Sequence, residues 1–324
     1  MTSRRPLSGR QGEKGNKPGG HSVPSGLYWT LLAALLLAST AALVFAYTHE
    51  QDDVNGPVAA RWCSNHALPC SDAVTWSLNP NAPNVNTTGG LTLRLSIQAA
   101  FASWAQASLK GQVITGISFA EGGDSTLPSP DANDCINVIG FTDPTKSDFS
   151  TGTIAFTAIA TAFGAPPTQY SCSSTGSNFI CPLPSCIVDA DIQFNPSDTF
   201  STASATPAND FDLQTIATHE IGHLLGMDHS GLANAIMFAF GDEGTVPTRN
   251  LSEDDILAVG SVYPSASFQS AVGKLSGTVT LNGSGIFAAH VVVTDANTGL
   301  AVTDGLTNSD GTYSIFAPPG SYQV

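Results

Sequence analysis

Short runs of apolar, β-branched and aromatic residues predict several strands in the first two thirds of the chain. In residues 74–78 every second side chain is apolar, and the Asn79-Pro80 pair closes the run. Four further runs have the same character and are also predicted as strands: 114–119, 135–141, 153–160 and 187–194. We expect one of the last two runs to lie at a sheet edge, where it can accept a substrate as an added strand.

A different spacing predicts a helix over residues 91–109. Apolar side chains recur there three or four positions apart, at Leu93, Ile97, Ala100, Phe101 and Trp104. The two aromatic residues are interpreted as core, and Gly111 is expected to end the helix.

Two more helices are predicted nearer the middle and end of this region. One covers 211–225, with Asp210 as its N-cap, and the other covers 251–263, with Ser252 as its N-cap. Acidic residues 253–255 suit the positive end of the second helix, although calcium binding is an alternative role for them. Strand, helix, several strands and two helices together predict an α+β fold.

The pattern changes after Pro264. Residues 265–273 are small and polar and are predicted as a linker, and 274–324 alternate apolar and polar positions. The pairs Asn282-Gly283 and Asp310-Gly311 are typical of turns between strands. We therefore expect a small all-β module, and because 321–324 have strand character we expect the module to be truncated.

The first 47 residues are unlike the rest. Residues 1–26 are basic and rich in Gly, Ser and Pro, which predicts a disordered leader. Residues 27–47 contain no charged side chain, which indicates a signal peptide or an uncleaved signal anchor, with a buried core helix as the alternative. Either favoured interpretation sends 48–324 across a membrane, so the protein is expected to be secreted or anchored, with membrane contact only through 27–47.

Charge argues against one class of partner. The 324 residues carry a formal net charge of −15, yet the first 50 residues hold 5 of the 11 basic and 2 of the 26 acidic side chains, which leaves −18 for the remainder. Such a surface repels phosphates, so nucleic-acid binding is not expected. The sequence carries no signal for the oligomeric state.

The cysteine content fits an exported protein. There are six, all before residue 190: Cys63, Cys70, Cys135, Cys172, Cys181 and Cys186. An even number predicts up to three disulfides, and sequence proximity favours a Cys63–Cys70 pair. A thiolate metal site is the alternative, but no C-x-x-C spacing supports it.

The densest chemical signal is the stretch from His219 to His229, which reads H-E-x-x-H-x-x-G-x-x-H. On a helix, His219 and His223 share one face and can aim two imidazoles at one metal ion. Glu220 lies beside the first ligand, close enough to reach a metal-bound water. Gly226 can take a positive φ and end the helix in a turn that brings His229 back as a third ligand.

Three protein ligands leave the fourth position of a tetrahedral zinc ion open to water, as in catalytic sites. The alternative is a helix whose histidines are solvated or merely packed. With 7 His and 31 Gly in 324 residues, however, Gly and His fall by chance at the two added positions only about 0.002 of the time. The motif therefore predicts one catalytic zinc, with Glu220 as the general base.

Together, His219 to Ser230, the methionine at Met237 and the segment 251–263 resemble the matrixins, the matrix-metalloprotease-like branch of the metzincins. The resemblance covers 62–264 and implies a zinc endopeptidase with a mixed twisted sheet, a zinc helix, a Met-turn and a C-terminal helix. It implies that His219, His223 and His229 bind zinc, that Glu220 is the base and that Met237 is the Met-turn residue.

The chain departs from the family pattern in several places. No histidine lies between His66 and His219, so the second, structural zinc of animal matrixins is expected to be missing. The inhibitory cysteine motif is absent, and Phe238-Ala239 replaces the usual Tyr-Pro after the methionine. The C-terminal module, 274–324, is similar to carboxypeptidase-regulatory-like or collagen-adhesin B-type β-sandwich repeats.

The resulting functional hypothesis is a zinc-dependent endopeptidase acting on extracellular proteins or peptides. Two other classes are retained. In one, the β-module mediates surface adhesion and the metallopeptidase domain is a degenerate scaffold; in the other, the zinc site hydrolyses a non-peptide substrate.

Overall fold

The computed structural model describes residues 60–63, 73–127, 131, 134–143, 149–173, 178–244 and 249–324, together with the backbone of 5–6. The predicted signal segment 27–47 and almost all of the leader 1–26 lie outside these residues. Within the leader, β1 (Arg5–Pro6) pairs antiparallel with β15 (Phe240–Gly241). Disorder of the leader as a whole stays a prediction. In the part of the chain that is described, no helix is long and apolar enough to cross a membrane.

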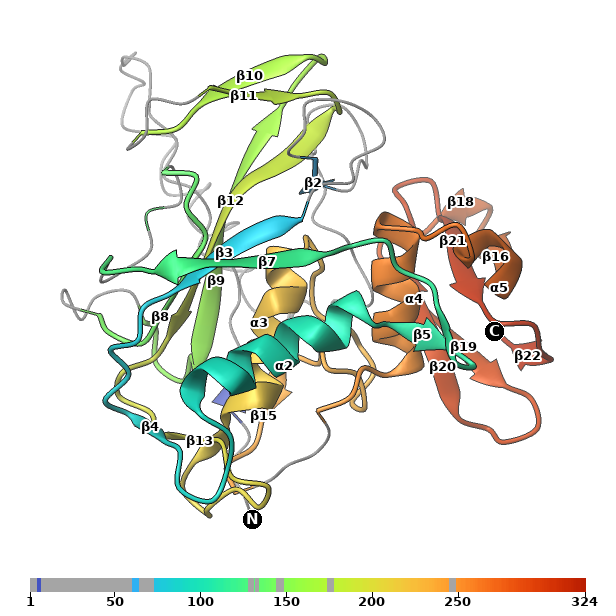
Figure 1. The fold of residues 1–324 in the computed structure, drawn as a ribbon. Coiled ribbons are helices and arrows are strands. Elements are labelled where there is room, and N and C mark those ends of the chain that lie inside the picture. Colours follow the sequence, from blue (N-terminus) through green and yellow to red (C-terminus); the bar gives the residue numbers. More distant parts are fainter. Residues whose placement is uncertain are drawn as a thin grey trace, which may run out of the picture.

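A mixed six-stranded sheet forms the first layer (Figure 1). Five strands follow the order β2-β12-β8-β3-β7, and the sixth, β9, also pairs with β12. Every pairing is parallel except that of β9 with β12. The strands are β2 (Arg61–Trp62), β3 (Val74–Leu78), β7 (Phe119–Asp124), β8 (Val138–Gly140), β9 (Ala155–Phe163) and β12 (Ser185–Phe194). The predicted mixed sheet is confirmed.

The structure decides which strand lies at the sheet edge. All ten residues of β12 are buried, and the strand is paired on both sides, so the prediction that 187–194 is an edge strand is wrong. Among the described strands β9 pairs with β12 alone. The edge strand is therefore β9, which corresponds to the other predicted run, 153–160.

The predicted strand at 114–119 is also wrong. Ile114 is fully buried, but its backbone carbonyl accepts from Ser265 N, and Gly116 N donates to Tyr263 O. Only the last residue of the run, Phe119, belongs to β7. The start of this stretch packs against the C-terminal segment, with Ile114 in a cluster with Leu257 and Phe268. Such a long-range contact is not encoded in a local pattern.

The first helix is shorter than its pattern predicts. Helix α2 (Leu93–Ala105) begins after Thr92, whose side chain accepts from Leu95 N. It ends at Ala105, with Gln106 as its C-cap, so the prediction that Gly111 ends the helix is wrong. The chain turns later, through Lys110 and Gly111, both with positive φ. That turn joins β5 (Ser108–Leu109) to β6 (Gln112–Val113).

The helix predicted over 211–225, α3 (Leu213–Leu224), begins two residues later than predicted. Its N-cap is Asp212 and not Asp210, because the Asp212 carboxylate accepts from Thr215 N at 2.8 Å. Asp210 instead accepts from the Thr199 hydroxyl. Arg249 adds two hydrogen bonds to the Asp212 carboxylate, so an ion pair as well as a cap fixes this end of the helix.

Helices α2 and α3 form a second layer beside the sheet, and α4 (Glu253–Val262) lies beyond them (Figure 1). The predicted core role of Phe101 and Trp104 is confirmed: Phe101 stacks on Trp76 with ring centroids 4.6 Å apart, and Trp104 is fully buried. The Trp104 indole N–H donates to Thr218 O at 2.7 Å. This bond ties α2 directly to the turn of α3 that carries the motif.

Two small strand groups complete this part. The three-stranded group consists of β4 (Val85–Asn86), β13 (Phe200–Ser201) and β14 (Phe211–Asp212), all parallel. The hairpin β10 (Thr168–Ser171) and β11 (Asn178–Cys181) lies at one end of the β9–β12 pair.

Disulfides join Cys135 to Cys172 and Cys181 to Cys186. Cys63 is also disulfide-bonded, but Cys70 lies outside the described residues, so the Cys63–Cys70 pairing stays a prediction. No described cysteine is a free thiol. The alternative of a thiolate metal site is therefore wrong for these five residues.

Two buried aspartates on β12 face the loop before β8. Asp189 accepts from Cys135 N at 2.8 Å, and Asp191 accepts from Val138 N at 2.7 Å and from Asp131 N at 2.9 Å. Burial, followed by the charge of Asp191, raises the pKa of Asp189 to about 8. Burial likewise raises the pKa of Asp191 to about 7.

These pKa values predict how stability depends on pH. A carboxyl whose pKa is higher in the folded state contributes stability fully below its unfolded pKa of about 3.9 and loses it as the pH rises through the folded value. Asp189→Asn removes one such titration and keeps an acceptor for Cys135 N. We expect its free energy of unfolding to change less between pH 5 and pH 8 than that of the wild type. The variant should therefore gain more stability relative to the wild type at pH 8 than at pH 5.

Urea unfolding of zinc-saturated protein at both pH values measures this difference. Asp124→Asn is the control, because Asp124 is exposed on β7. Equal pH dependence in the Asp189 variant and the wild type would show that Asp189 does not titrate in this range.

Residues 265–273, after Pro264, pack more closely against the preceding domain than expected for a linker. Residues 265–273 contain α5 (Phe268–Ala271), and Phe268 is buried against Leu257, Ile114 and Gly260. The segment therefore folds onto the preceding helix.

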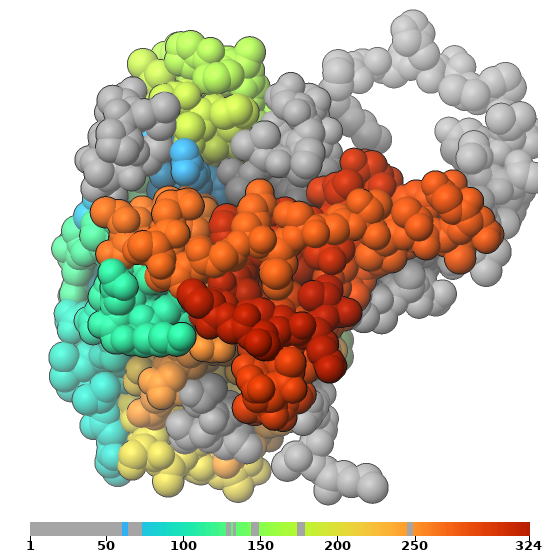
Figure 2. All heavy atoms as spheres, turned by 90° about the vertical axis from the view of Figure 1, so that its right-hand side faces the viewer, coloured from blue at the N-terminus to red at the C-terminus, as the bar shows by residue number. Residues whose placement is uncertain are grey.

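The remaining strands form the predicted all-β module. They are β16 (Gly273–Thr278), β17 (Thr280–Leu281), β18 (Ser284–Gly285), β19 (His290–Asp295), β20 (Ala301–Leu306), β21 (Thr312–Ala317) and β22 (Tyr322–Gln323). They pair as β16–β21, β17–β18 and β20–β19–β22 around a core that includes Val291, Val293 and Ile315. The Asn282-Gly283 turn, with both φ positive, joins β17 and β18 as predicted. Figure 2 shows this module covering much of one face of the molecule.

Candidate metal centre

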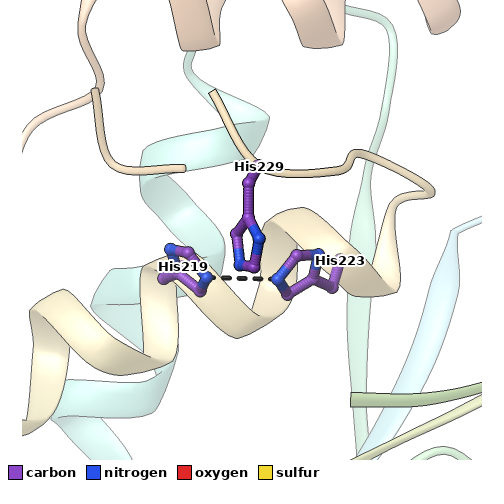
Figure 3. Close-up of side chains that lie close together, drawn as sticks. All are labelled: His219, His223 and His229. Atoms are coloured by element: carbon purple, nitrogen blue, oxygen red, sulfur yellow. Dashed lines mark hydrogen bonds between the residues drawn. The ribbon is translucent and has the colours of Figure 1, made fainter. Parts of the chain in front are cut away.

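Three imidazoles meet at one point beside α3 (Figure 3). His219 and His223 project from one face of the helix, and His229 approaches from the segment that follows it. The ring centroids are 4.8 to 5.3 Å apart, and the potential ligand atoms all lie within 4.8 Å of one another. Among the described residues, this is the one group of three or more His, Cys, Asp or Glu side chains close enough to share a metal.

Hydrogen bonds set the tautomers of the two helical histidines. His219 Nδ1 lies 2.7 Å from Ile236 O, and His223 Nδ1 lies 2.8 Å from Met227 O. Because a carbonyl oxygen only accepts, each Nδ1 carries the proton and each Nε2 presents a lone pair. Metal-binding histidines are oriented in this way.

The spacing of the two Nε2 atoms fits a zinc ion. They lie 3.1 Å apart, and two lone pairs at that distance repel each other unless a cation accepts both. Zinc–nitrogen bonds of about 2.0–2.1 Å in a tetrahedron place two ligand atoms roughly 3.3 Å apart. The donor set and its geometry therefore suit zinc.

The pKa values of the two helical histidines are both lowered. Burial is the main cause that lowers the pKa of His219, and the nearby charges of His223 and His229 lower it further. Burial also lowers the pKa of His223. Neutral imidazoles leave their lone pairs available, which metal binding requires.

The turn predicted at Gly226 is confirmed. Gly226 has φ +84°, and its N–H donates to His223 O at 2.8 Å. A side chain there would also collide with Ala60 O, only 2.6 Å from the position of a Cβ. The Asp228 carboxylate accepts from His229 N at 2.8 Å and helps orient the third ligand.

Met237 lies beneath the metal-binding helix, where the resemblance predicted a Met-turn residue. A Cβ at Gly222 would overlap the Met237 sulfur and lie 3.0 Å from Trp104 Cζ2. Gly222 thus allows the helix to approach both side chains. This role of Gly222 was not predicted from the sequence, although a glycine inside a helix is a signal of close packing.

Gly222→Ala is expected to destabilise the protein. Alanine gains about 1 kcal/mol of helix propensity over glycine, but overpacking a core costs about 1–3 kcal/mol or more. Because Trp104 and Met237 are both buried, we expect a net loss of about 1–2 kcal/mol and a fall in Tm of roughly 2–8 °C.

Differential scanning calorimetry of the zinc-saturated proteins measures this shift. Gly123→Ala is the matched control, because Gly123 lies on β7 with nothing within 4 Å of an added Cβ. An unchanged or higher Tm for Gly222→Ala would show that the helix is not packed as closely as described.

Asp255 supports the Met-turn from the start of α4. Its carboxylate accepts from Ile236 N at 2.8 Å and from Met237 N at 3.1 Å, and it also closes a capping box with Ser252. Ile236 O in turn accepts from His219, so a chain of hydrogen bonds runs from Asp255 to a predicted zinc ligand. Burial raises the pKa of Asp255, and these hydrogen bonds oppose the rise.

The predicted capping role of the acidic residues 253–255 is confirmed. Calcium binding by the same residues has no geometric support, because Asp254 and Asp255 are buried and accept from protein donors. Calcium binding stays a prediction.

Glu220 follows His219 on α3 and is fully buried. The Thr157 hydroxyl, on the edge strand β9, lies 2.8 Å from Glu220 Oε2 and 3.0 Å from Glu220 O. Thr157 therefore donates to this residue and helps hold it in place. Nothing in the local sequence around Thr157 points to this contact.

Comparisons with known proteins agree with the expected resemblance over part of the chain. Residues 144–264, from before β9 to the end of α4, match the family model described as Matrixin. The chain is 39% identical over 82 residues to Metalloendoproteinase 1 of Glycine max, 48% over 52 residues to Karilysin of Tannerella forsythia and 39% over 70 residues to Matrix metalloproteinase-25 of Mus musculus.

These matches are short relative to both partners. They cover 24%, 16% and 21% of this chain, and 25%, 10% and 11% of the respective relatives. The chain thus spans a quarter or less of the length of these relatives. The matches support a matrix-metalloprotease-like metzincin for the segment that holds the three histidines.

Proposed function

We propose that this protein is a zinc-dependent endopeptidase that hydrolyses peptide bonds of extracellular proteins. The observation that carries the proposal is the convergence of His219, His223 and His229, whose potential ligand atoms all lie within 4.8 Å of one another. Glu220, the residue after His219, is fully buried. The similarity of this segment to metalloendoproteinases supports the same chemistry.

The three histidines would hold the ion, and each has a defined anchor. Ile236 O and Met227 O fix the rings of His219 and His223, and Asp228 holds the backbone of His229. A zinc ion bound there supplies a Lewis acid that lowers the pKa of water to roughly 7 and polarises the scissile carbonyl.

Glu220 performs the proton transfers. Its carboxylate takes a proton from the attacking water and passes it to the leaving amine. Thr157 donates to Oε2, which orients the carboxylate. The substrate is positioned along β9, which among the described strands pairs only with β12 and can offer the main-chain donors and acceptors of its other side to an extended peptide.

The proposed location is outside the cytoplasm, either secreted or held by residues 27–47. The disulfides support an oxidising compartment. The motif is complete, and its three histidines lie close together. This argues against a degenerate scaffold whose only role is adhesion. Protein or peptide substrates are the proposed partners.

Digestion of casein by the purified full chain tests the proposal. We expect cleavage that o-phenanthroline abolishes and that phenylmethylsulfonyl fluoride leaves unchanged. Cleavage that continues in excess chelator, or no cleavage by protein shown to contain zinc, would contradict it.

A further inference from the structure

The C-terminal module contacts the start of α4 through buried polar groups. Asp254 is 1% exposed, and its Oδ1 accepts from the Thr303 hydroxyl at 2.9 Å and from Asp304 N at 3.1 Å. Thr303 and Asp304 belong to β20 and are themselves 1% and 0% exposed. A folded stalk that only spaced two domains would leave such groups in water.

A second contact of the module lies beside the metal-binding segment. Asp304 Oδ2 lies 2.7 Å from His290 Nε2, on the neighbouring strand β19. A Cβ at Gly231 would come within 2.8 Å of Asp304 Oδ2 and 2.9 Å of His290 Cε1. The module thus packs on residue 231, only two residues after the third histidine.

Apolar packing supports the same docking. Phe316 of β21 stacks edge-on against Phe268 of α5, with ring centroids 5.0 Å apart. Phe268 is buried in a cluster with Leu257 of α4 and Ile114. Figure 1 shows α4 between the metal-binding helix and the strands of the module.

One residue links this docked module to the ligand. Ser230 follows His229, and its hydroxyl donates to Asp254 Oδ2 at 2.7 Å. Its backbone N–H donates to Met237 O at 2.8 Å, which closes the segment that carries the third ligand against the Met-turn. One carboxylate, Asp254, therefore joins β20 to the residue beside His229.

We propose that the C-terminal β-module positions the third metal ligand, through Thr303 and Asp304 acting on Asp254 and Ser230. The module is then part of the metal centre's support and not a spacer. Thr303 and Asp304 act as positioning residues, because they touch neither the metal nor substrate. This inference rests on the metal site of the proposed function, and its consequences are measurable without peptidase activity.

Thr303→Val in the full chain removes the hydroxyl that donates to Asp254 and changes the side-chain shape little. We expect zinc transfer to a chromogenic chelator to become roughly ten-fold faster, the lower end of the effect of groups that orient metal ligands. Thr312→Val is the matched control: it also removes a hydroxyl that donates to an aspartate, but within the exposed turn at Asp310. Its zinc transfer should equal that of the wild type.

Gly231→Ala tests the contact from the ligand side, because the added methyl pushes against Asp304 and His290. We expect it to accelerate zinc transfer as Thr303→Val does. In the zinc-free proteins, both variants should speed hydrogen exchange of the amides in 229–237, whereas Thr312→Val should not.

Wild-type zinc transfer and wild-type exchange in both Thr303→Val and Gly231→Ala would overturn the proposal. Failure of the proposed function is a separate result. A wild type that binds no zinc contradicts the zinc site, while faster exchange of 229–237 in the two variants still establishes that the module holds this segment.

Discussion

Glu220→Gln is expected to keep about one zinc per chain while lowering kcat/KM on a peptide substrate by about 10³-fold. Glutamine has the size of glutamate and still accepts from Thr157 through its amide oxygen, so the site keeps its shape. It cannot take a proton from water at neutral pH, and general acid–base catalysis contributes typically about 10²–10⁴-fold. The loss should fall on kcat and leave KM nearly unchanged.

Metal content and steady-state kinetics on one preparation measure both parts of this result. Glu121→Gln is the matched control. Glu121 lies on β7, at the opposite edge of the sheet from β9, and pairs with Arg94 of α2. The control should show wild-type kinetics. Undiminished peptidase activity in Glu220→Gln would remove Glu220 from the mechanism.

His223→Ala is expected to abolish retention of zinc. The variant leaves two histidine ligands and opens the space that the ring fills on α3. Two neutral ligands do not hold zinc in the tetrahedral arrangement that structural and catalytic sites share. The metal content should therefore fall from about one zinc per chain to nearly none.

Dialysis against equimolar zinc, followed by plasma mass spectrometry, gives the metal content. Far-UV circular dichroism of the same sample shows whether the variant is folded. His66→Ala removes a histidine outside the motif and should retain zinc. A His223→Ala protein that is folded and still binds one zinc would show that the assigned ligands are wrong.

The metal site could be predicted from the sequence because its determinants are local. The i, i+4 spacing places His219 and His223 on one helical face, and the positive φ of Gly226 brings His229 back to them. Both features are contained in eleven consecutive residues. Their geometry depends little on the rest of the fold.

The supports of the site are long-range and were not predicted. Thr157 reaches Glu220 from β9, and Asp255 reaches Met237 from α4, across separations of 63 and 18 residues. Capping correctly predicted where α4 begins, but not that its second aspartate also holds the Met-turn. No periodicity or motif links residues so far apart.

The same limit explains the errors in the fold. Residues 114–119 have the composition of a strand, and 265–273 have that of a linker. In the structure the two segments bury each other: Ile114 and Phe268 share a cluster, and Ser265 N donates to Ile114 O. Each segment's conformation is set by a partner about 150 residues away.

Restoration of activity by zinc tests the central claim most directly. The full chain is stripped with o-phenanthroline, dialysed, and titrated with zinc while cleavage of a quenched fluorescent peptide is followed. We expect no cleavage by the stripped protein, and a rise that saturates at about one zinc per chain, as one three-histidine site requires. Cleavage by the stripped protein, or saturation only at two or more zinc ions per chain, would contradict a single catalytic zinc at His219, His223 and His229.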